Sequence, residues 1–320
     1  TEPQRSELQS AKETLRIFMV VVAVLLALLS VLLTSMIMRP FAELRTALRK
    51  VSAGDLNQTV EQHSYLVTSQ ISEDVNTTLR KLRTLNESRE EFVSNVSHEL
   101  KTPIALIQGY AEGLEDGLCE EKEMREQYLG VILDEAGRMN KLVRQLLTLS
   151  QLESDKPDLN MEVFDLRESA ESVLRKTKVL AEESGAKVSL EAPDTGISVR
   201  ADAFRIDEVL MNYVSNAFHH VEEGGEVIVR LLPQGERVRC EVYNSGKRIP
   251  EEDLGRLFEK FYKVDKAHTR KYGGSGIGLS IVRAIMTQHN MPCGVENCPS
   301  GVLFWFELPR AAQTDGEEHK

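Results

Sequence analysis

The first strong pattern along the chain is an uncharged apolar run from Ile17 to Met38, IFMVVVAVLLALLSVLLTSMIM, in which only Ser30, Thr34 and Ser35 are polar. As a helix its 22 residues would rise about 33 Å, enough to cross a hydrocarbon core of roughly 30 Å. A buried core helix and a signal peptide are the alternatives. However, Arg16 and Arg39 bracket a run too long for a signal peptide, and no small-residue cleavage site follows. The pattern predicts one transmembrane helix over residues 17–38. The four basic residues that follow the span and the three that precede it decide little about its orientation, and residues 1–16 are expected to be an extracytoplasmic remnant only if the domains after the span are cytoplasmic.

Helical periodicity continues after this run. Pro40 suits the first turn of a short helix, and Gly54 with Asp55 supplies a turn and connector. Residues 71–92 then place apolar side chains at three- and four-residue spacings, which is typical of helices that pair in a bundle. An ordinary amphipathic helix in a monomer is the alternative. The positions are Ile71, Val75, Leu79, Leu82, Leu85 and Phe92.

A helical hairpin is predicted next. The periodicity runs on to Leu114, breaks over residues 115–120 and resumes from about Lys122 to Leu152, so two long antiparallel helices are joined by a short loop. The second helix carries an apolar stripe that is interrupted only by Glu135. Two hairpins would bury this stripe as a four-helix bundle, which predicts a homodimer. The stripe comprises Met124, Tyr128, Val131, Ile132, Met139, Leu142, Leu146 and Leu149.

The pattern changes to that of an α/β domain after a polar linker over residues 154–160, which contains Pro157. Alternating apolar runs predict strands at KVSLEA, EVIVRLL, VRCEVYN and VLFWFEL. Helical stretches at 165–184, 203–220 and 276–289 are interleaved with them. The polar residues 311–320 predict a disordered tail.

Composition excludes some classes of function. The chain has 320 residues, with 39 basic and 50 acidic ones, and its net charge of -11 has the wrong sign for coating nucleic acid. No direct nucleic-acid partner is expected, and phosphates, if bound, must be held locally. The cysteines are too few and scattered for a disulfide framework, and the last two lack the paired spacing of a zinc site. They are Cys119, Cys240, Cys293 and Cys298.

The first candidate site is the run SNVSHELKTPI, in which His98 and Thr102 share a helical face. A neutral imidazole is a nucleophile, and the carboxylate of Glu99 could orient the ring and accept its other proton. Pro103 lacks the N–H that would bond to the carbonyl of Glu99, which predicts a kink beside the histidine. Because a histidine on a helix is more often structural, this run alone leaves the role of His98 open.

The second candidate site is the run KYGGSGIGLSIVRAI, whose glycines precede a helix. They are Gly273, Gly274, Gly276 and Gly278. Glycines let backbone amides approach a phosphate, and the helix N-terminus adds a favourable dipole. The run is neither the dinucleotide pattern nor a P-loop. A lid hinge without a ligand is the alternative.

Two further runs carry amides. EVLMNYVSNAFHH places Asn212 and Asn216 on one helical face, where amide oxygens suit Mg²⁺. Buried asparagines that bridge elements are the alternative. VYNSGKRIP joins a strand end to a turn, where Asn244 and Gly246 could face a base edge.

In this order the pieces resemble the histidine kinases of two-component signalling, over nearly the whole chain from residue 17. In that family SHELKTP is the phosphoacceptor box, NYVSNA the asparagine box, NSGKRIP the first glycine box, LFEKFYKVD the phenylalanine box and GGSGIGLSIV the second glycine box. The resemblance implies a multidomain protein. Its parts are a HAMP relay at 39–88, suggested by RPFAEL, GDL and the helical seam, a dimerisation and phosphotransfer domain at 89–153, and a Bergerat-type α/β-sandwich ATP-binding domain at 160–310.

The resemblance also implies residue roles. His98 would be phosphorylated by ATP and donate to an aspartate of a response regulator, with Glu99 as its acid/base partner. Thr102 would position water for phosphatase action, and Asn216 would ligate Mg²⁺ with Asn212 beside it. Lys263 and Arg270 would reach the γ-phosphate, and Phe258 and Phe261 would pack the lid base. The other residues implied around the nucleotide are His219, His220, Asn244, Gly246, Gly274, Gly276 and Gly278.

The chain departs from the family pattern at two places. Asn244 stands where an aspartate usually contacts the adenine amino group, and Arg248 stands where a glycine is usual. The asparagine carbonyl can accept the same bond. His219 and His220 replace a lysine and an aromatic residue, and a neutral histidine is a weaker phosphate partner. NSGKRIP with FYKVDKA is similar to a Gram-positive subgroup that includes glycopeptide-resistance sensors.

The resemblance thus implies an ATP- and Mg²⁺-dependent sensor kinase in the bacterial cell membrane, homodimeric, with its kinase domains in the cytoplasm. Because the chain starts at Thr1, an upstream segment with a first span is expected to be missing. Two alternatives stay open. A non-kinase ATPase of the wider fold, shared with type II topoisomerases and heat-shock chaperones, would leave SHELKTP without a role. A degenerate kinase acting as a phosphatase or scaffold would account for Asn244 and His219.

Overall fold

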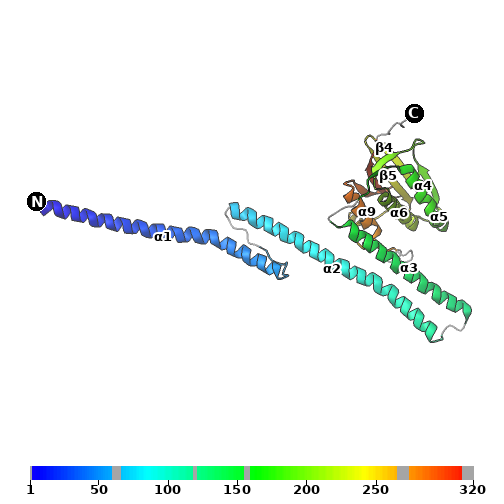
Figure 1. Cartoon of the computed structure of the whole chain (residues 1–320), viewed down its shortest axis with the longest axis horizontal. Coiled ribbons are helices and arrows are strands. Elements are labelled where there is room, and N and C mark those ends of the chain that lie inside the picture. The colour runs from blue at the N-terminus through cyan, green and yellow to red at the C-terminus, as the bar shows by residue number, and fades with distance from the viewer. Residues whose placement is uncertain (1, 60–65, 118–120, 155–158, 265–273, 312–320) are drawn as a thin grey trace, which may run out of the picture. The chain divides into compact units, whose positions relative to one another are not determined.

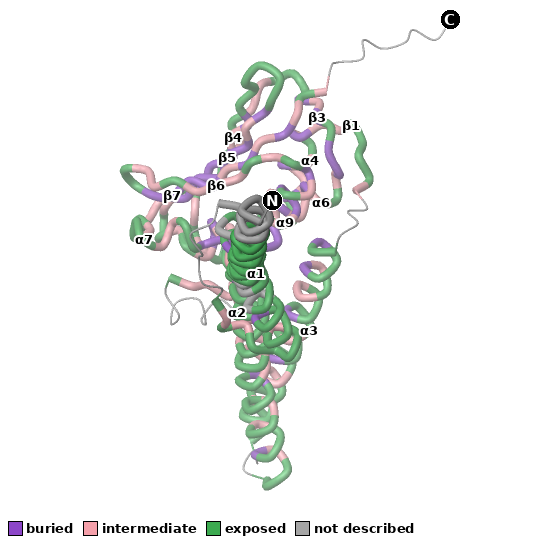
Figure 2. The backbone as a smooth tube through the Cα atoms, turned by 90° about the vertical axis from the view of Figure 1, so that its left-hand side faces the viewer, coloured by how far each residue is buried: buried purple, intermediate pink, exposed green. Residues whose placement is uncertain are grey.

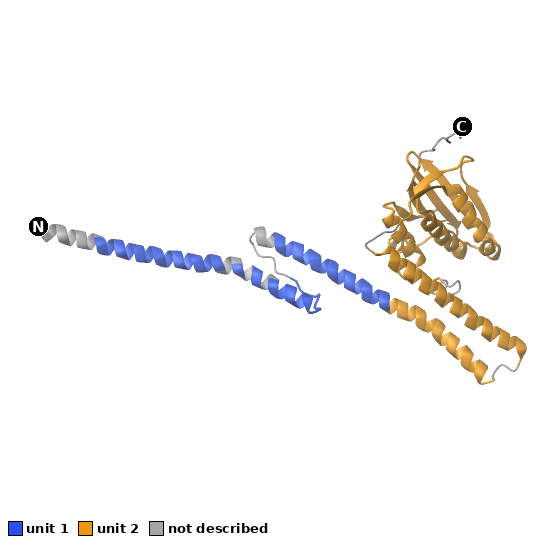
Figure 3. Ribbon diagram, viewed as in Figure 1, with its two compact units in different colours: residues 1–93 blue, residues 94–320 orange. Residues whose placement is uncertain are grey.

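The structure is a computed structural model, and it describes residues 2–59, 66–117, 121–154, 159–264 and 274–311. Figure 3 shows its two compact units, residues 1–93 and 94–320. Several predicted features lie outside the described residues. These are Cys119, Arg270, Gly273, residues 155–158 of the linker and residues 312–320 of the tail.

The first unit is helical. Helix α1 spans Glu2–Ser52 and α2 spans Leu66–Glu115, the latter running on into the second unit (Figure 1). Within the described helices, Lys12–Thr34 is long and apolar enough to cross a membrane by length and composition, and it is not buried. This stretch overlaps the predicted span at 17–38.

The connector after α1 differs in part from the prediction. Pro40 lies inside α1 and does not begin a separate helix. The fixed φ of proline, about −65°, is itself helical, so the chain gives up one backbone hydrogen bond without leaving the helix. The turn is found where it was predicted, because Gly54 has a φ of 97°, which favours glycine, and Asp55 Oδ1 accepts from Asn57 N at 3.1 Å.

The second unit begins with the predicted hairpin. It consists of the C-terminal part of α2 and the whole of α3, Lys122–Leu152. The bounds of α3 agree with the sequence pattern. The rings of Tyr110 and Tyr128 meet edge to face across the hairpin, with centroids 4.8 Å apart. Glu135, the acidic interruption of the apolar stripe, is buried and paired with Arg138 at 3.1 Å, which compensates its charge.

An α/β domain follows. Its five-stranded sheet has the order β2-β4-β5-β7-β6, with β2 parallel to β4 and the other pairs antiparallel. Helices α4, α6 and α9 pack together, and α6 and α9 also contact the sheet, which gives two layers (Figure 1). The strands are β1 Glu162–Asp165, β2 Lys187–Glu191, β3 Ser198–Ala201, β4 Glu226–Gln234, β5 Arg237–Ser245, β6 Cys293–Cys298 and β7 Gly301–Pro309. The helices are α4 Leu166–Lys176, α5 Lys178–Ser184, α6 Ala203–His220, α7 Glu251–Leu254 and α9 Gly278–Gln288.

The core of this domain lies between the sheet and its helices. Tyr213 of α6, Ile285 of α9 and Phe306 of β7 are fully buried, and Figure 2 shows buried backbone concentrated in the strands and in α6 and α9. The predicted strands and helices of the domain are confirmed. The short elements β1, β3, β6 and α7 were not predicted, because four to six residues with little alternation carry too weak a periodic signal.

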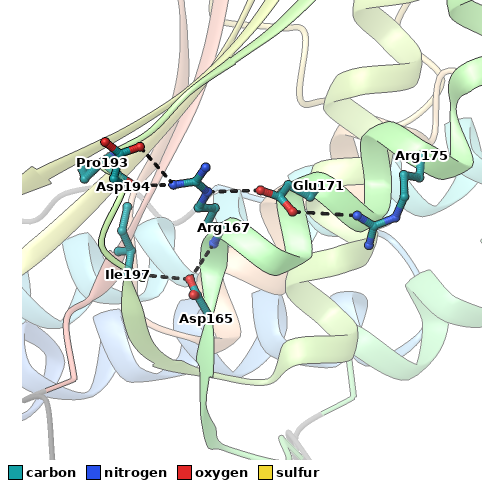
Figure 4. A network of polar contacts seen from close by, with 7 residues as sticks. All are labelled: Asp165, Arg167, Glu171, Arg175, Pro193, Asp194 and Ile197. Carbon is teal, nitrogen blue, oxygen red and sulfur yellow. Dashed lines mark hydrogen bonds and ion pairs between the residues drawn. The ribbon is translucent and has the colours of Figure 1, made fainter.

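A polar network fixes the approach to α6 (Figure 4). The carboxylate of Asp165 caps α4 by accepting from Arg167 N at 2.9 Å, and it also accepts from Ile197 N at 3.0 Å. The guanidinium of Arg167 donates to Pro193 O and to Glu171. These bonds hold the segment that leads into β3 against α4, and β3 leads directly to α6.

Candidate nucleotide site and phosphoacceptor helix

The second unit contains a cavity of about 1210 Å³ where α3, α6, the glycine run and the loop after β5 meet. One part of its wall is apolar, as an adenine ring would require. Most of the predicted nucleotide-binding residues line the cavity: Asn212, Asn216, His219, His220, Asn244, Lys263, Gly274, Gly276 and Gly278. The apolar wall is formed by Met211, Ile249, Leu257, Leu279, Val302 and Phe304.

Helix α6 presents the two predicted amides. Asp202 caps this helix by accepting from Arg205 N at 3.1 Å. Asn212 Nδ2 donates to the backbone O of Glu208 at 2.8 Å, which holds the amide in place. A Cβ added to Gly278 would lie 2.6 Å from Asn212 Oδ1. A side chain where α9 begins would therefore displace the Asn212 amide, which favours glycine at this position.

The phenylalanine box folds onto the glycine run. Phe261 N donates to Gly276 O at 2.9 Å, and a Cβ added to Gly276 would lie 2.8 Å from the Phe261 carbonyl carbon. Gly276 has a φ of 74° and Phe261 a φ of 63°, so both backbones are left-handed. Phe258 is buried beside them. The expected packing of Phe258 and Phe261 against the lid stays a prediction, because residues 265–273 lie outside the described residues.

The loop after β5 is held from several sides. Asn244 is buried with 2% of its surface exposed and lines the cavity. Gly246 does not line it but makes the turn, with a φ of 138°. Asn297 of β6 clamps the loop, because it accepts from Ile249 N at 2.9 Å and donates to Ile249 O at 2.7 Å. Asn297 was missed by sequence reasoning, since nothing local marks a partner 48 positions away.

The predicted phosphoacceptor lies on α2. The side chain of His98 is exposed, and Thr102 Oγ1 lies 3.5 Å from the carbonyl oxygen of His98. Lys263 Nζ donates to Glu99 Oε1 at 2.8 Å, and the lysine side chain is only 9% exposed. Lys263 also lines the cavity. One lysine thus connects the cavity to the residue that follows His98, a pairing that the sequence did not reveal.

Three more bonds join the α/β domain to α3 and to its end. Ser275 Oγ in the glycine run donates to Gln145 Oε1 at 2.8 Å, and Gln288 Nε2 donates to Leu152 O at 2.6 Å. Lys260 pairs with Glu153 at 2.7 Å. The cavity therefore has a wall from α3 that sequence reasoning missed, as it also missed Glu208, although Glu208 stands one turn before Asn212.

Three ionisable residues of the α/β domain, Tyr213, Cys240 and Cys293, have raised pKa values but do not line the cavity. Burial raises the pKa of Tyr213, with a smaller contribution from Cys293, and the Tyr213 hydroxyl donates to Trp305 O at 3.3 Å. Burial also raises the pKa of the thiols of Cys240 and Cys293, which keeps them protonated. Among the described residues no group of three or more histidine, cysteine or acidic side chains is arranged to hold a metal.

A glycine run beside an asparagine-bearing helix, at a cavity with apolar side chains in its lining, is typical of a class of ATP-binding domain. Residues 201–312 match the Histidine kinase-, DNA gyrase B-, and HSP90-like ATPase family, and residues 88–155 match the His Kinase A (phospho-acceptor) domain. The second match gives SHELKTP a role, which a non-kinase ATPase of this fold would not. The chain belongs to the sensor histidine kinases of two-component systems.

Individual relatives agree with this placement. The chain is 33% identical over 228 residues to the sensor histidine kinase WalK of Bacillus subtilis, covering 70% of this chain and 37% of WalK. It is 32% identical over 237 residues to the sensor protein SrrB of Staphylococcus aureus, covering 71% and 39%. It therefore spans less than half the length of these relatives. A crystal structure of the histidine kinase ThkA in complex with the response regulator protein TrrA matches with a TM-score of 0.60 and 28% identity, covering 72% of this chain and 65% of that one.

Proposed function

We propose that this protein binds ATP in the cavity and transfers the γ-phosphoryl group to His98. The observation that carries the proposal is the position of Lys263, which lines the cavity and contacts Glu99 beside His98. A ring nitrogen of His98 attacks the γ-phosphorus, the bond from that phosphorus to the β–γ bridging oxygen breaks, and ADP leaves. Glu99 accepts the proton from the other ring nitrogen. Catalysis is mainly positioning and charge neutralisation.

The residues of the cavity fit a magnesium ion. Asn216 lines the cavity, as does the glycine run that would hold the phosphates, and its amide oxygen would serve as a ligand. Mg²⁺ uses few protein ligands when phosphates and water complete its coordination, so the absence of a carboxylate cluster among the described residues is compatible with it. When bound, the ion would neutralise phosphate charge. Asn216 would hold it, and Asn212 would support the same face of α6.

The phosphoryl group would pass from His98 to an aspartate of a cognate response regulator that docks on the hairpin. The exposure of His98 supports this step, as does the relative ThkA, whose crystal structure contains a response regulator. Thr102 is exposed one turn away on the same helical face, where it would position water for dephosphorylation of the regulator. Phosphatase activity is the second candidate function on that ground.

The remaining parts follow the family arrangement. Residues 39–88 would form a HAMP relay, which is supported by α1 reaching Ser52, the turn at Gly54 and α2 starting at Leu66. Residues 89–153 would be the dimerisation and phosphotransfer domain and residues 160–310 the ATP-binding domain. The apolar stretch of α1 would anchor a homodimer in the cell membrane with its kinase domains in the cytoplasm. A signal would reach His98 as a helix rearrangement.

The test is labelling of the purified full chain with γ-³²P ATP and magnesium, comparing wild type with His98→Gln. We expect acid-labile, alkali-stable label in the wild type and none in the variant. Glu91→Gln, an exposed position on the same helix, is the matched control and should label normally. Label that persists in His98→Gln would contradict the assignment of the phosphoacceptor. An unlabelled wild type that still binds ATP would favour the phosphatase or scaffold alternative.

A further inference from the structure

One face of α3 closes the nucleotide cavity. The residues of α3 that line it recur every three or four positions, as expected for a single helical face. They are Gly137, Asn140, Lys141, Arg144, Gln145 and Thr148. The buried leucines Leu142 and Leu149 occupy a different face of the same helix. Helix α3 thus uses one stripe for packing and a separate stripe for the cavity.

The cavity face of α3 suits an anion. It has no carboxylate and no large apolar side chain, but it has two cations, Lys141 and Arg144. Charge is also segregated along the helix. All of its acidic residues precede residue 136, whereas the remainder up to Leu152 contains only basic charges, at Arg138, Lys141 and Arg144. The cationic half is the one that reaches the cavity.

Three of the other charged side chains that line the cavity are engaged in ion pairs. Lys263 is paired with Glu99, Arg248 with Glu251, and the acidic Glu208 with Arg205. Lys141 and Arg144 form no ion pair with any residue in the part of the chain that the structure describes, although both line the cavity. The hydrogen bond from Ser275 to Gln145, the residue after Arg144, places this face directly against the glycine run.

We propose that Lys141 and Arg144 form a phosphate-binding subsite for the nucleotide, contributed by the hairpin and not by the ATP-binding domain. The inference rests on the proposed function, because it takes ATP as the occupant of the cavity. The glycine run supplies backbone amides from one side, and Arg144 supplies a planar pair of donors from the other. The nucleotide then contacts both the α/β domain and α3. A nucleotide with more phosphates therefore makes more contacts with α3 and binds with higher affinity.

The test is nucleotide affinity of the purified full chain, measured by calorimetry with AMP, ADP and the β,γ-imido analogue of ATP. We expect Arg144→Ala to lower the affinity for the ATP analogue about tenfold and Lys141→Ala to lower it about threefold. The affinity for AMP should change less than twofold in either variant. Arg125→Ala, an exposed arginine of α3 that does not line the cavity, is the matched control and should bind like the wild type.

Three outcomes would overturn the inference. Unchanged affinity of both variants for the ATP analogue would show that α3 does not contact the phosphates. An equal loss for AMP, ADP and the ATP analogue would show a structural role, which a circular dichroism melt of each variant would corroborate. A wild-type chain that binds none of the three nucleotides would overturn the proposed function, and this inference with it.

Discussion

The helical hairpin and the α/β domain of the second unit use apolar residues in opposite ways. In the α/β domain Leu166, Ile206 and Leu210 are completely buried. In α3 the side chains of Leu133 and Leu147 are 71% and 59% exposed. The α/β domain thus completes its core within one chain, whereas the hairpin leaves an apolar face uncovered, which a second copy would bury in the proposed dimer.

The two regions also divide the chemistry. The hairpin carries the exposed His98, the proposed phosphoacceptor, on a long helix, and the α/β domain contributes most of the cavity lining, including a loop that Asn297 clamps. In the proposed function a docked regulator would use the exposed helix, while the nucleotide would use the cavity. The ion pair between Glu99 and Lys263 lies where these two environments meet.

The largest expected effect on stability comes from a buried leucine of the α/β domain, compared with an exposed leucine of α3. Leu210→Ala should lower the free energy of unfolding of the α/β domain by about 2–5 kcal/mol, because it leaves a cavity in a closed core. Trp305, the single tryptophan, lies in β7 and reports this unfolding by fluorescence in urea.

Leu133→Ala is the matched control for that measurement. It should leave the Trp305 transition within about 0.5 kcal/mol of wild type but weaken self-association about tenfold in sedimentation equilibrium. Equal destabilisation of the α/β domain by the two substitutions would break the comparison.

A smaller effect, on nucleotide affinity, is expected from the ion pair between Glu99 of the hairpin and Lys263 of the α/β domain. Glu99→Gln should tighten binding of the ATP analogue about threefold to fivefold, since the γ-phosphate then no longer competes with a carboxylate for Lys263. ADP, which lacks the γ-phosphate, should bind as before. Calorimetry measures both affinities.

The double variant supplies the control for this coupling. In a Lys263→Ala background Glu99→Gln should have no effect on the affinity for the ATP analogue, because the competition has been removed. If Glu99→Gln tightens ADP and the ATP analogue equally, the carboxylate acts on the cavity through general repulsion and not through Lys263.

The smallest effect is a pH dependence inside the α/β domain. Burial raises the pKa of Cys240 above that of the unfolded thiol, about 8.5, so its stabilising contribution is complete below that value and is lost as pH rises. Between pH 8 and pH 9 we expect the contribution of this thiol to the free energy of unfolding of the domain to fall by about 0.7 kcal/mol. In Cys240→Val the free energy of unfolding in urea should fall by about 0.7 kcal/mol less between pH 8 and pH 9 than in the wild type. The same fall in both proteins would contradict the contribution of Cys240.

Local periodicity explains which elements could be predicted. The bounds of α3 and α6 follow from apolar side chains repeating every three or four residues, and the long strands follow from alternation. The glycine run and the asparagine pair were predicted as well, because their chemistry is carried by neighbours along the chain. Strand β6 is not predicted, since CGVENC does not alternate, and the helix start predicted at Pro40 is wrong, because α1 continues through it.

The sequence by itself determined the longer helices and strands of the second unit, the nucleotide motifs and the phosphoacceptor run, because each depends on residues within a few turns of one another. Only the tertiary structure decided that Lys263 meets Glu99 across 164 positions, that Asn297 clamps Ile249, and that the Lys141–Arg144 face of α3 closes the cavity. Such contacts depend on how the hairpin and the sheet close on each other, and no local repeat in the chain encodes that closure.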